Sequence, residues 1–241
     1  MQLKNSLCSI DTEDHWIPPD PRATVTEDGL IGISVGLAPK MYARMYTLGI
    51  FPWFNEDEVV CWFSPPIRSI TFTNEVRIAK SMRPFINQRK WRFSVNTAFD
   101  RVVEACKEAQ RPGQRGTWIS SVFEDNFNDM HRLGMAHSFE VWDNDRLVGG
   151  TFGVMSGRLF VGESMYHGET NAYKFAYIGM CQYLEQLGVV AVDNQLPTNH
   201  LSSLGAQNIS RDYFLSLLKD ISSEHSRVEV PETDSFFLKV Q

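Results

Sequence analysis

The stretch that decides the fold runs from Ser138 to Asp193 and reads SFEVWDNDRLVGGTFGVMSGRLFVGESMYHGETNAYKFAYIGMCQYLEQLGVVAVD. Its first half alternates in apolar and polar residues and is interrupted by turn residues at 143–145 and 156–157, which is typical of successive antiparallel strands. Helical spacing follows from Ala172 to Leu187, and Gly188 is well placed to end the helix. The predicted strands are 138–142, 146–154, 158–162 and, after the helix, 189–192.

The residues on either side of this stretch extend the same sheet. The predicted upstream elements are strands at 68–73 and 91–95 and helices at 78–87, 97–109 and 121–133. Pro84 is expected to shorten or bend the first of these helices, and a capping box of Ser121 and Glu124 is expected to begin the last. Downstream, short helices are expected near His200 and at 211–218, and the tail that ends at Gln241 has no predicted structure.

The order of these elements predicts the fold class. A strand, two helices, a strand meander, a helix and a last strand resemble the N-acetyltransferase-like (GNAT-like) arrangement, an α/β (α+β) fold with a mixed sheet. We expect this sheet to splay where the meander meets the last strand. Fold class alone carries little information about function.

A smaller unit precedes this sheet. Residues 1–28 are polar and contain three of the prolines, so they read as an irregular lead-in. A helix is expected from Lys40 to Leu48, followed by an aromatic loop that contains residues 51–54 and by a strand from Val59 to Phe63. Pro65 and Pro66 break the chain, which predicts a small N-terminal α/β domain at 1–65 and a GNAT-like domain at 66–241.

Composition excludes several classes of function. The chain has 241 residues and a formal net charge of −6, which argues against binding to long duplex nucleic acid but allows a local basic patch. No apolar run is long enough to span a membrane, and no secretory signal is visible, so a cytoplasmic protein is expected. The four cysteines are scattered and the histidines lack metal-ligand spacing, so we expect reduced thiols and no metal.

Two carboxylates and an amide stand at predicted strand ends. Glu163 follows the apolar run at 160–162, Asp193 follows the run at 189–192, and Gln195 is two residues further on. Residues at the carboxyl ends of neighbouring strands converge on one crevice of an open sheet. This spacing is compatible either with a catalytic or substrate-binding cluster or with solvated strand ends and ion pairs.

Aromatic and basic residues offer two further sets of candidates. Most of the aromatic residues at 51–63, together with Trp118, are expected in the core, but aromatic side chains on loops can also stack on bases. Residues 77–92 are locally basic within an acidic chain, which is compatible with a solvated surface or with a patch for a phosphate backbone. The basic residues named in this segment are Lys80, Arg83, Arg89, Lys90 and Arg92.

Two phosphate-binding motifs bear on the substrate, because acyl transfer is common on such folds. The nearest match to a coenzyme A pyrophosphate loop is Gln110-Arg-Pro-Gly-Gln-Arg115, which fails at its last position and follows a helix instead of a strand. No GxxxxGK[ST] loop is present, so neither coenzyme A nor ATP is expected.

Taken together, several strings resemble the leucyl/phenylalanyl-tRNA–protein transferase family. They occur in family order over residues 29–218 and are Tyr46-Thr-Leu-Gly-Ile-Phe-Pro-Trp-Phe54, Trp62-Phe-Ser-Pro-Pro-Ile-Arg68, Gly116-Thr-Trp-Ile119, Ala136-His-Ser-Phe-Glu-Val-Trp142, Leu147-Val-Gly-Gly150, Phe160-Val-Gly-Glu-Ser-Met165, Asp193-Asn-Gln195 and His200-Leu-Ser-Ser-Leu-Gly-Ala206. One such string is a weak signal, but the ordered set is specific.

This resemblance implies an activity. The family moves Leu, Phe or Met from aminoacyl-tRNA to the N-terminal Lys or Arg of an acceptor protein, which marks that protein for degradation. An aminoacyl ester is already activated, so the resemblance implies no ATP, metal or other cofactor, and leaves positioning, amine deprotonation and oxyanion stabilisation to the protein. The implied partners are aminoacyl-tRNA and acceptor proteins, with the enzyme acting as a monomer.

The resemblance also implies the site residues. Asp193 and Gln195 would hold and help deprotonate the attacking amine, and Glu163 would bind near the terminal ribose or the amino group of the donor amino acid. The donor pocket and the contacts with the terminal adenosine would involve Phe160, Gly162, Val192, Thr151, Ser164, Trp53 and Trp118. The basic segment at 77–92 would meet the acceptor stem.

The chain departs from the family pattern at Phe63, Pro66, Ile67 and Thr151. Thr151 replaces a large apolar residue and widens the rim of the pocket, so these departures bear on donor preference and adenosine contacts more than on the reaction. Two alternatives stay open at this point: another acyltransferase of the same fold that uses coenzyme A or a peptidoglycan precursor, and a non-catalytic protein that binds tRNA ends.

Overall fold

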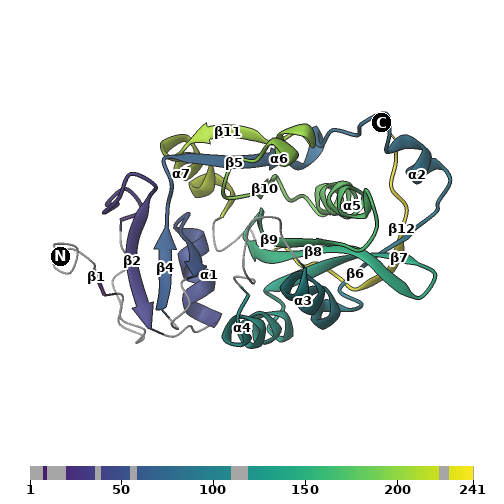
Figure 1. The fold of residues 1–241 in the computed structure, drawn as a ribbon. Coiled ribbons are helices and arrows are strands. Elements are labelled where there is room, and N and C mark those ends of the chain that lie inside the picture. The colour runs from purple at the N-terminus through teal and green to yellow at the C-terminus, as the bar shows by residue number, and fades with distance from the viewer. Residues whose placement is uncertain are drawn as a thin grey trace.

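The computed structural model describes residues 8–9, 20–35, 39–54, 59–109, 119–222 and 228–240. In these parts of the chain the strands form two sheets, one of four strands and one of eight, which lie side by side (Figure 1). The larger sheet combines antiparallel strands with one parallel pair, so it is mixed and the α/β class is confirmed. None of the helices in the described parts is long and apolar enough to cross a membrane.

The smaller sheet is built from the N-terminal strands. Its order is β1 (Cys8–Ser9), β2 (Leu30–Val35), β4 (Val59–Phe63) and β3 (Phe51–Phe54), and helix α1 (Pro39–Thr47) joins β2 to β3. The helix ends as predicted, because Gly49 adopts a φ of 73° that an L side chain disfavours.

Two expectations for this unit were wrong. Residues 51–54 are a strand and not a loop, and Pro52 is tolerated there because β3 lies at the edge of the sheet. The lead-in is not wholly irregular, because β1 pairs in parallel with β2. The domain division at residue 65 stays a prediction.

The larger sheet contains the predicted meander at its centre. Its order is β11 (Gln207–Ser210), β5 (Ile67–Phe72), β10 (Ala191–Asp193), β9 (Leu159–His167), β8 (Arg146–Ser156), β7 (Ala136–Asp143), β6 (Arg92–Val95) and β12 (Thr233–Phe236). The antiparallel strands β7, β8 and β9 confirm the meander. The edge strands β11 and β12 were not predicted, because four polar-rich residues in each carry little pattern.

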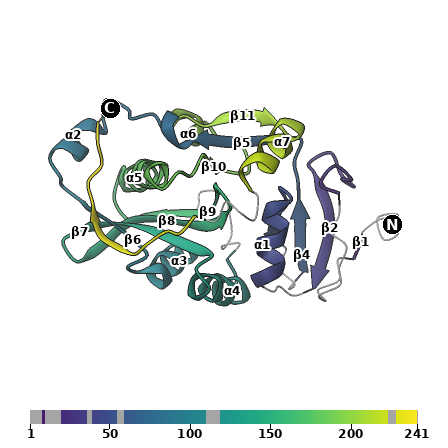
Figure 2. The ribbon, with the colours of Figure 1, turned by 180° about the vertical axis from the view of Figure 1, so that it is seen from behind.

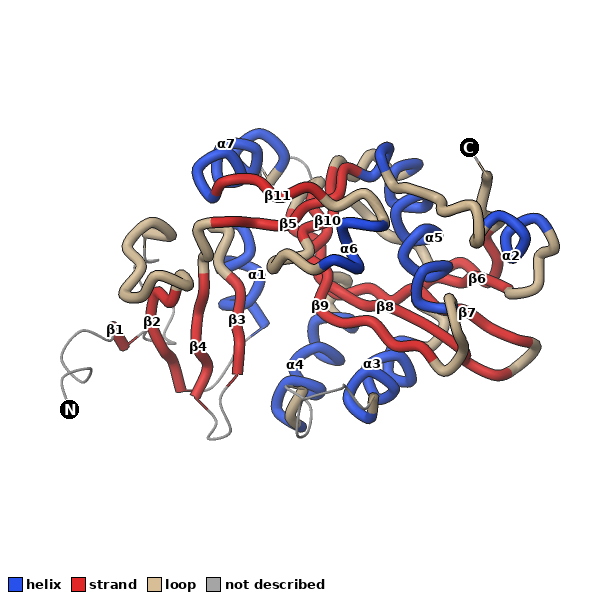
Figure 3. The backbone as a smooth tube through the Cα atoms, turned by 45° about the horizontal axis from the view of Figure 1, so that its top comes forward, coloured by secondary structure: helices blue, strands red, loops and turns tan. Residues whose placement is uncertain are grey.

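Helices cover both faces of the larger sheet (Figure 2). Helix α5 (Ala172–Gln186) packs on one face, while α3 (Phe99–Glu108), α4 (Ser121–Arg132) and α1 contribute to the apolar cluster on the other. Helix α7 (Arg211–Ile221) packs beside β5 and β11 (Figure 3), and the short α6 (Asn199–Ser203) follows β10. The cluster on the α5 face contains Phe160 and Val192, whereas Val161 and Ala191 belong to the α1 face.

Two helix starts differ from the sequence expectation. The helix predicted at 78–87 is confined to α2 (Arg83–Asn87), which begins at the residue before Pro84 because proline suits the first helical positions. The capping box at Ser121 is not formed, since Ser120 is the N-cap and makes no side-chain capping hydrogen bond. Glu124 instead accepts a hydrogen bond from Lys107 at 2.6 Å.

The pairing of strands in the larger sheet becomes irregular where β9 lies beside β10. The two strands pair in parallel through Val161 and Asp193, after which β10 ends and β9 continues to His167. At the same level β9 carries a bulge, because Gly153 faces Gly162 while Phe152 faces Ser164, which leaves Glu163 unpaired. Irregular pairing therefore occurs where the candidate residues converge.

Candidate active site

A buried ion pair joins Arg68 of β5 to Asp193 at the end of β10. The Arg68 Nε donates to one carboxylate oxygen of Asp193 at 2.8 Å, and Nη2 donates to the other at 2.6 Å. The side chains are only 2% and 1% exposed, and the guanidinium lies 4.6 Å from the ring centroids of both Phe51 and Phe214. Because the guanidinium makes two hydrogen bonds to the carboxylate and is itself held between two aromatic rings, it fixes the orientation of the carboxylate and stabilises its negative charge.

Gln195 is held by the same ion pair through its backbone. Its N–H donates to Asp193 Oδ1 at 2.9 Å, and its carbonyl accepts from the N–H of Ser69 at 3.1 Å. These contacts keep Gln195 at a φ of 64°, a left-handed conformation that costs about 1–3 kcal/mol for a residue other than glycine. The side chain of Gln195 hydrogen-bonds to Glu163.

Glu163 is the bulge residue of β9, and a tyrosine from the smaller unit holds its side chain. The hydroxyl of Tyr46 in α1 donates a hydrogen bond to a carboxylate oxygen of Glu163. Tyr46 is buried, whereas Glu163 stays partly exposed. Bulges re-aim side chains near functional sites, and here the bulge turns the carboxylate toward α1.

The surroundings of Glu163 raise its pKa to about 8. Burial is the largest cause, and the charge of Asp193 acts in the same direction, whereas the hydrogen bonds from Tyr46 and Gln195 and the charge of Arg68 oppose it. Near neutral pH this carboxyl group is therefore largely protonated, and it ionises close to the pH at which an α-amine loses its proton.

The raised pKa predicts how stability depends on pH. Because the folded state binds the Glu163 proton more tightly than the unfolded state, the stability from this group is present below pH 4.5 and is lost as pH rises through 8. Glu163→Gln, which cannot ionise, should match wild type at pH 5 and melt about 3–8 °C higher at pH 9 in thermal unfolding.

A matched control for this prediction is Glu169→Gln. The pKa of Glu169 is lowered by its hydrogen bond to Arg146, so the same substitution there should not raise the melting temperature at pH 9. An equal gain in both variants, or no gain for Glu163→Gln, would show that the carboxyl group at 163 does not titrate as described.

The predicted pocket residues lie on the other face of the sheet. Phe160 and Val192 face each other across the parallel pair, belong to the α5 cluster and are fully buried. The hydroxyl of buried Thr151 donates to the carbonyl of Ser164 at 3.0 Å, and a Cβ at Gly162 would meet only ordinary contacts at 3.7 Å or more. These residues are neighbours. They lie next to Glu163 and Asp193 at the point where β10 ends and β9 continues.

Only part of the predicted aromatic set can be located. Trp53 lies on the edge strand β3 with 42% of its surface exposed, and its ring packs in a T-shaped arrangement with the Phe63 ring, the two centroids being 5.8 Å apart. Phe51 is instead buried beside Arg68. Trp118 lies outside the described residues. Among the described residues of the predicted set, Trp53 therefore has the exposed ring that could stack on a base.

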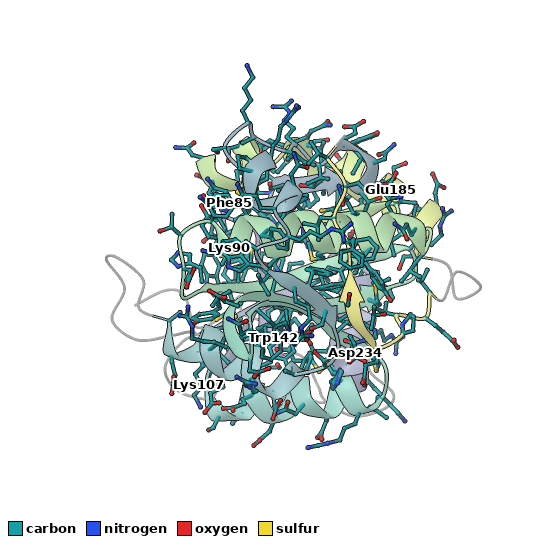
Figure 4. The ribbon with its side chains drawn as sticks, turned by 90° about the vertical axis from the view of Figure 1, so that its right-hand side faces the viewer. Phe85, Lys90, Lys107, Trp142, Glu185 and Asp234 are labelled. Carbon is teal, nitrogen blue, oxygen red and sulfur yellow. The ribbon has the colours of Figure 1, made fainter. Side chains whose placement is uncertain are left out.

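The basic segment divides into two groups. Lys90 lies over the ring of Phe85 (Figure 4) and over that of Trp91. Arg92 donates to the carbonyl of Asp234 at 2.8 Å. In contrast, a cavity of about 450 Å³ is lined by Val76, Arg77, Ile78, Ala79, Arg83 and Ser203. Lys80 is also exposed, and none of Arg77, Lys80 and Arg83 forms an ion pair with a described residue.

Sequence reasoning missed Arg68 and Tyr46. Arg68 is the second residue of strand β5, and a buried arginine requires a carboxylate partner, so its position was a usable signal. Tyr46 carried no local signal, because its contact with Glu163 spans 117 residues of sequence. Within the described parts of the chain, no cluster of His, Cys, Asp and Glu is arranged to bind a metal ion.

Comparison with known sequences relates the chain to one family. The family model described as leucyl/phenylalanyl-tRNA protein transferase matches residues 70–219, and the model of that family's N-terminal domain matches residues 44–66. A relative from Shewanella pealeana, named leucyl/phenylalanyl-tRNA–protein transferase, is 40% identical over 89% of this chain and 90% of its own length. A relative of the same name from Christiangramia forsetii is 43% identical over 82% of this chain and 94% of its own.

Comparison with solved structures gives more distant similarities. FemX is 12% identical with a TM-score of 0.46, over 78% of this chain and 74% of that one. L-PGS from Bacillus licheniformis is 13% identical with a TM-score of 0.40, over 71% of this chain and 56% of that one.

Proposed function

The chain belongs to the leucyl/phenylalanyl-tRNA protein transferase family, and on this premise we propose that it moves Leu or Phe, and also Met, from aminoacyl-tRNA to the N-terminal Lys or Arg of acceptor proteins. It is an aminoacyltransferase, and the reaction exchanges an ester for an amide. We further propose that it acts in the cytoplasm as a monomer and that the added residue marks the acceptor for degradation.

The observation that carries the assignment of the reaction centre is the cluster of Glu163, Gln195 and Asp193. The attacking amine forms a bond to the ester carbonyl carbon, the bond to the ribose oxygen breaks, and that oxygen leaves with a proton. Because the ester is already activated, the protein must mainly orient the two substrates and handle one proton. A carboxylate and an amide side by side offer both donors and acceptors for this purpose.

Asp193 supports the reaction indirectly. Arg68 occupies both of its oxygens and the N–H of Gln195 adds a third hydrogen bond, so little of the carboxylate is left for an incoming amine. We assign it the task of holding Gln195, whose side chain orients the amine. This assignment refines the expectation that Asp193 and Gln195 act on the amine together.

The donor side chain would be accepted next to Gly162, on the face that carries Phe160, Val192 and Thr151. Gly162 presents no side chain on this face, and a Cβ at this position would meet only ordinary contacts, with Val192 at 3.9 Å. A chain unbranched at Cβ, such as Leu or Phe, would enter more easily than Val or Ile. One methylene group in such a pocket contributes only about 1–3 kcal/mol, so shape must do most of the selection.

The tRNA would be held by the exposed Trp53 ring, by Trp118 and Ser164 near the terminal nucleotide, and by the basic residues around the cavity. Arg77, Lys80 and Arg83 can reach a phosphate backbone because no described carboxylate pairs with them. Such contacts release counterions and make binding depend on salt.

Transfer of labelled Leu, Phe or Met from each charged tRNA to a peptide that begins with Lys or Arg tests the proposed function. We expect product with the pure protein and loss of product after RNase treatment of the donor. An enzyme that uses coenzyme A or a peptidoglycan precursor would be insensitive to RNase, and a tRNA-binding protein without activity would shift the charged tRNA in a gel but form no product.

Loss of one exposed arginine should weaken tRNA binding in a salt-dependent way. Arg83→Ala removes a phosphate contact, so the affinity for charged tRNA should fall several-fold and the slope of log K against log salt should decrease by about 1. Binding is measured by filter retention at several salt concentrations. The control is Arg132→Ala, whose exposed side chain lies at the end of α4 on the other face of the sheet, and it should change neither quantity.

A further inference from the structure

The two carboxylates of the cluster differ in what they can accept. Asp193 is fully buried and receives hydrogen bonds from Arg68 and from the Gln195 N–H. Glu163 is partly exposed, and its hydrogen-bonding partners are Tyr46 and the side chain of Gln195. A proton from a substrate therefore has a direct path to Glu163 and is blocked from Asp193 by its partners.

Tyr46 is the group that orients Glu163. It is 1% exposed, and its ring lies 5.7 Å from the ring of Tyr42, a second buried tyrosine one turn earlier on the same helix. The hydroxyl of Tyr46 donates a hydrogen bond to Glu163, whereas the buried hydroxyl of Tyr42 has no hydrogen-bond partner among the described residues. Two tyrosines of the same helix thus differ in one hydrogen bond, which makes them a matched pair.

We propose that Glu163 accepts the proton of the attacking amine and that Tyr46 is the positioning residue that holds Glu163 for this step. The inference rests on the proposed transferase function. As the N–C bond forms, the amine proton passes to ionised Glu163. As the C–O bond breaks, the protonated Glu163 returns that proton to the leaving ribose oxygen. No other reactant is consumed, and Glu163 ends the cycle ionised.

The groups that surround Glu163 suit it to this exchange. The groups that act on it are Tyr46 from α1, Asp193 from β10, Arg68 from β5 and Gln195 from the following turn. Their combined effect with burial is a pKa of about 8, close to the value of about 7.7–8.0 for an α-amine. Proton transfer is most effective between groups of matched pKa near the working pH.

The test compares Tyr46→Phe with Tyr42→Phe in single-turnover transfer, with saturating charged tRNA and peptide, between pH 6 and 9.5. Loss of the Tyr46 hydrogen bond should raise the pKa of Glu163 and move the rising limb of the rate profile upward by about one unit. The rate of Tyr46→Phe should then fall about 5–10-fold at pH 7 and recover to within a few-fold at pH 9. Tyr42→Phe should keep the wild-type profile.

The titration of the amine contributes equally to both variants, so only a change at the site can separate their profiles. Melting temperatures establish that both variants fold. An unmoved profile for Tyr46→Phe, or the same shift for Tyr42→Phe, would overturn the positioning role, because a purely structural contact changes the rate at all pH values alike.

Glu163→Gln tests the proton acceptor itself. The transfer rate should fall at least ~10²-fold, and it should no longer show the rise with pH that ionisation of Glu163 produces. The dissociation constant for charged tRNA should stay within a few-fold of wild type. A wild-type rate in this variant would refute the inference but leave the transferase assignment intact. Failure of the wild-type protein to transfer any amino acid would instead refute the proposed function.

Discussion

Replacing Asp193 by alanine is expected to lower the transfer rate at least ~10²-fold and to lower the free energy of unfolding by about 3–5 kcal/mol. Both effects have one cause. Arg68 is 1% exposed and depends on Asp193 for two of its hydrogen bonds, so truncation leaves a buried cation without its carboxylate. Gln195 simultaneously loses the acceptor of its N–H. Thermal unfolding and single-turnover transfer measure the two losses.

A double variant separates stability from catalysis at this position. Arg68→Met combined with Asp193→Asn removes both charges, so most of the lost stability should return, since apolar or neutral replacements of a buried pair are often tolerated. The transfer rate should stay low, because the orientation of Gln195 depends on the ion pair. Recovery of the rate together with stability would show that Asp193 serves the fold alone, and a wild-type rate in Asp193→Ala would remove it from the site.

Gln195→Ala is expected to lower the transfer rate at least ~10²-fold with little change in stability. Its side chain bonds Glu163 and does not fill the core, so its loss should act on the orientation of the amine. The effect should appear in the single-turnover rate, while the dissociation constant for charged tRNA should hardly change. A normal rate with weakened tRNA binding would assign Gln195 to donor binding instead.

The backbone of Gln195 supplies a second measurement. Gln195→Gly relieves a left-handed φ of 64°, so this variant should be as inactive as Gln195→Ala and melt at or above the wild-type temperature. Asn144→Gly is the control, because Asn144 has a φ of 54° in the turn between β7 and β8 and should gain stability with no loss of rate. Loss of stability in Gln195→Gly would mean that its conformation carries no strain.

The parts of the fold that the sequence predicted are those with a local cause. The meander strands alternate in apolar and polar residues over long runs, and Gly49, Gly134 and Gly188 end helices at positive φ. The hydrophobic pattern and the positions of the helix-ending glycines therefore predict the same elements. The edge strands β11 and β12 are short and polar, and their pairing with β5 and β6 is decided by the tertiary structure. The strand at 51–54 was missed for the same reason, since Pro52 is compatible with an edge and with a loop.

For the site, the sequence predicted which residues come together but not the role of each. Glu163, Asp193 and Gln195 follow apolar runs in neighbouring strands, so their convergence could be inferred from strand order. The division of their roles could not, because it depends on Arg68 and Tyr46, which arrive from other elements. The bulge that leaves Glu163 unpaired has no sequence signature either, and it decides where that carboxylate points.

The contact between Tyr46 and Glu163 has a consequence for the newly made chain. It joins residues 117 positions apart, and the ion pair of Arg68 with Asp193 joins residues 125 apart. A ribosome that has delivered the N-terminal sheet must therefore extend the chain to residue 163 before the first contact can close, and to residue 193 before the second. We expect the nascent protein to be inactive until strand β10 has emerged from the ribosome, so that it does not use charged tRNA while its own synthesis is in progress.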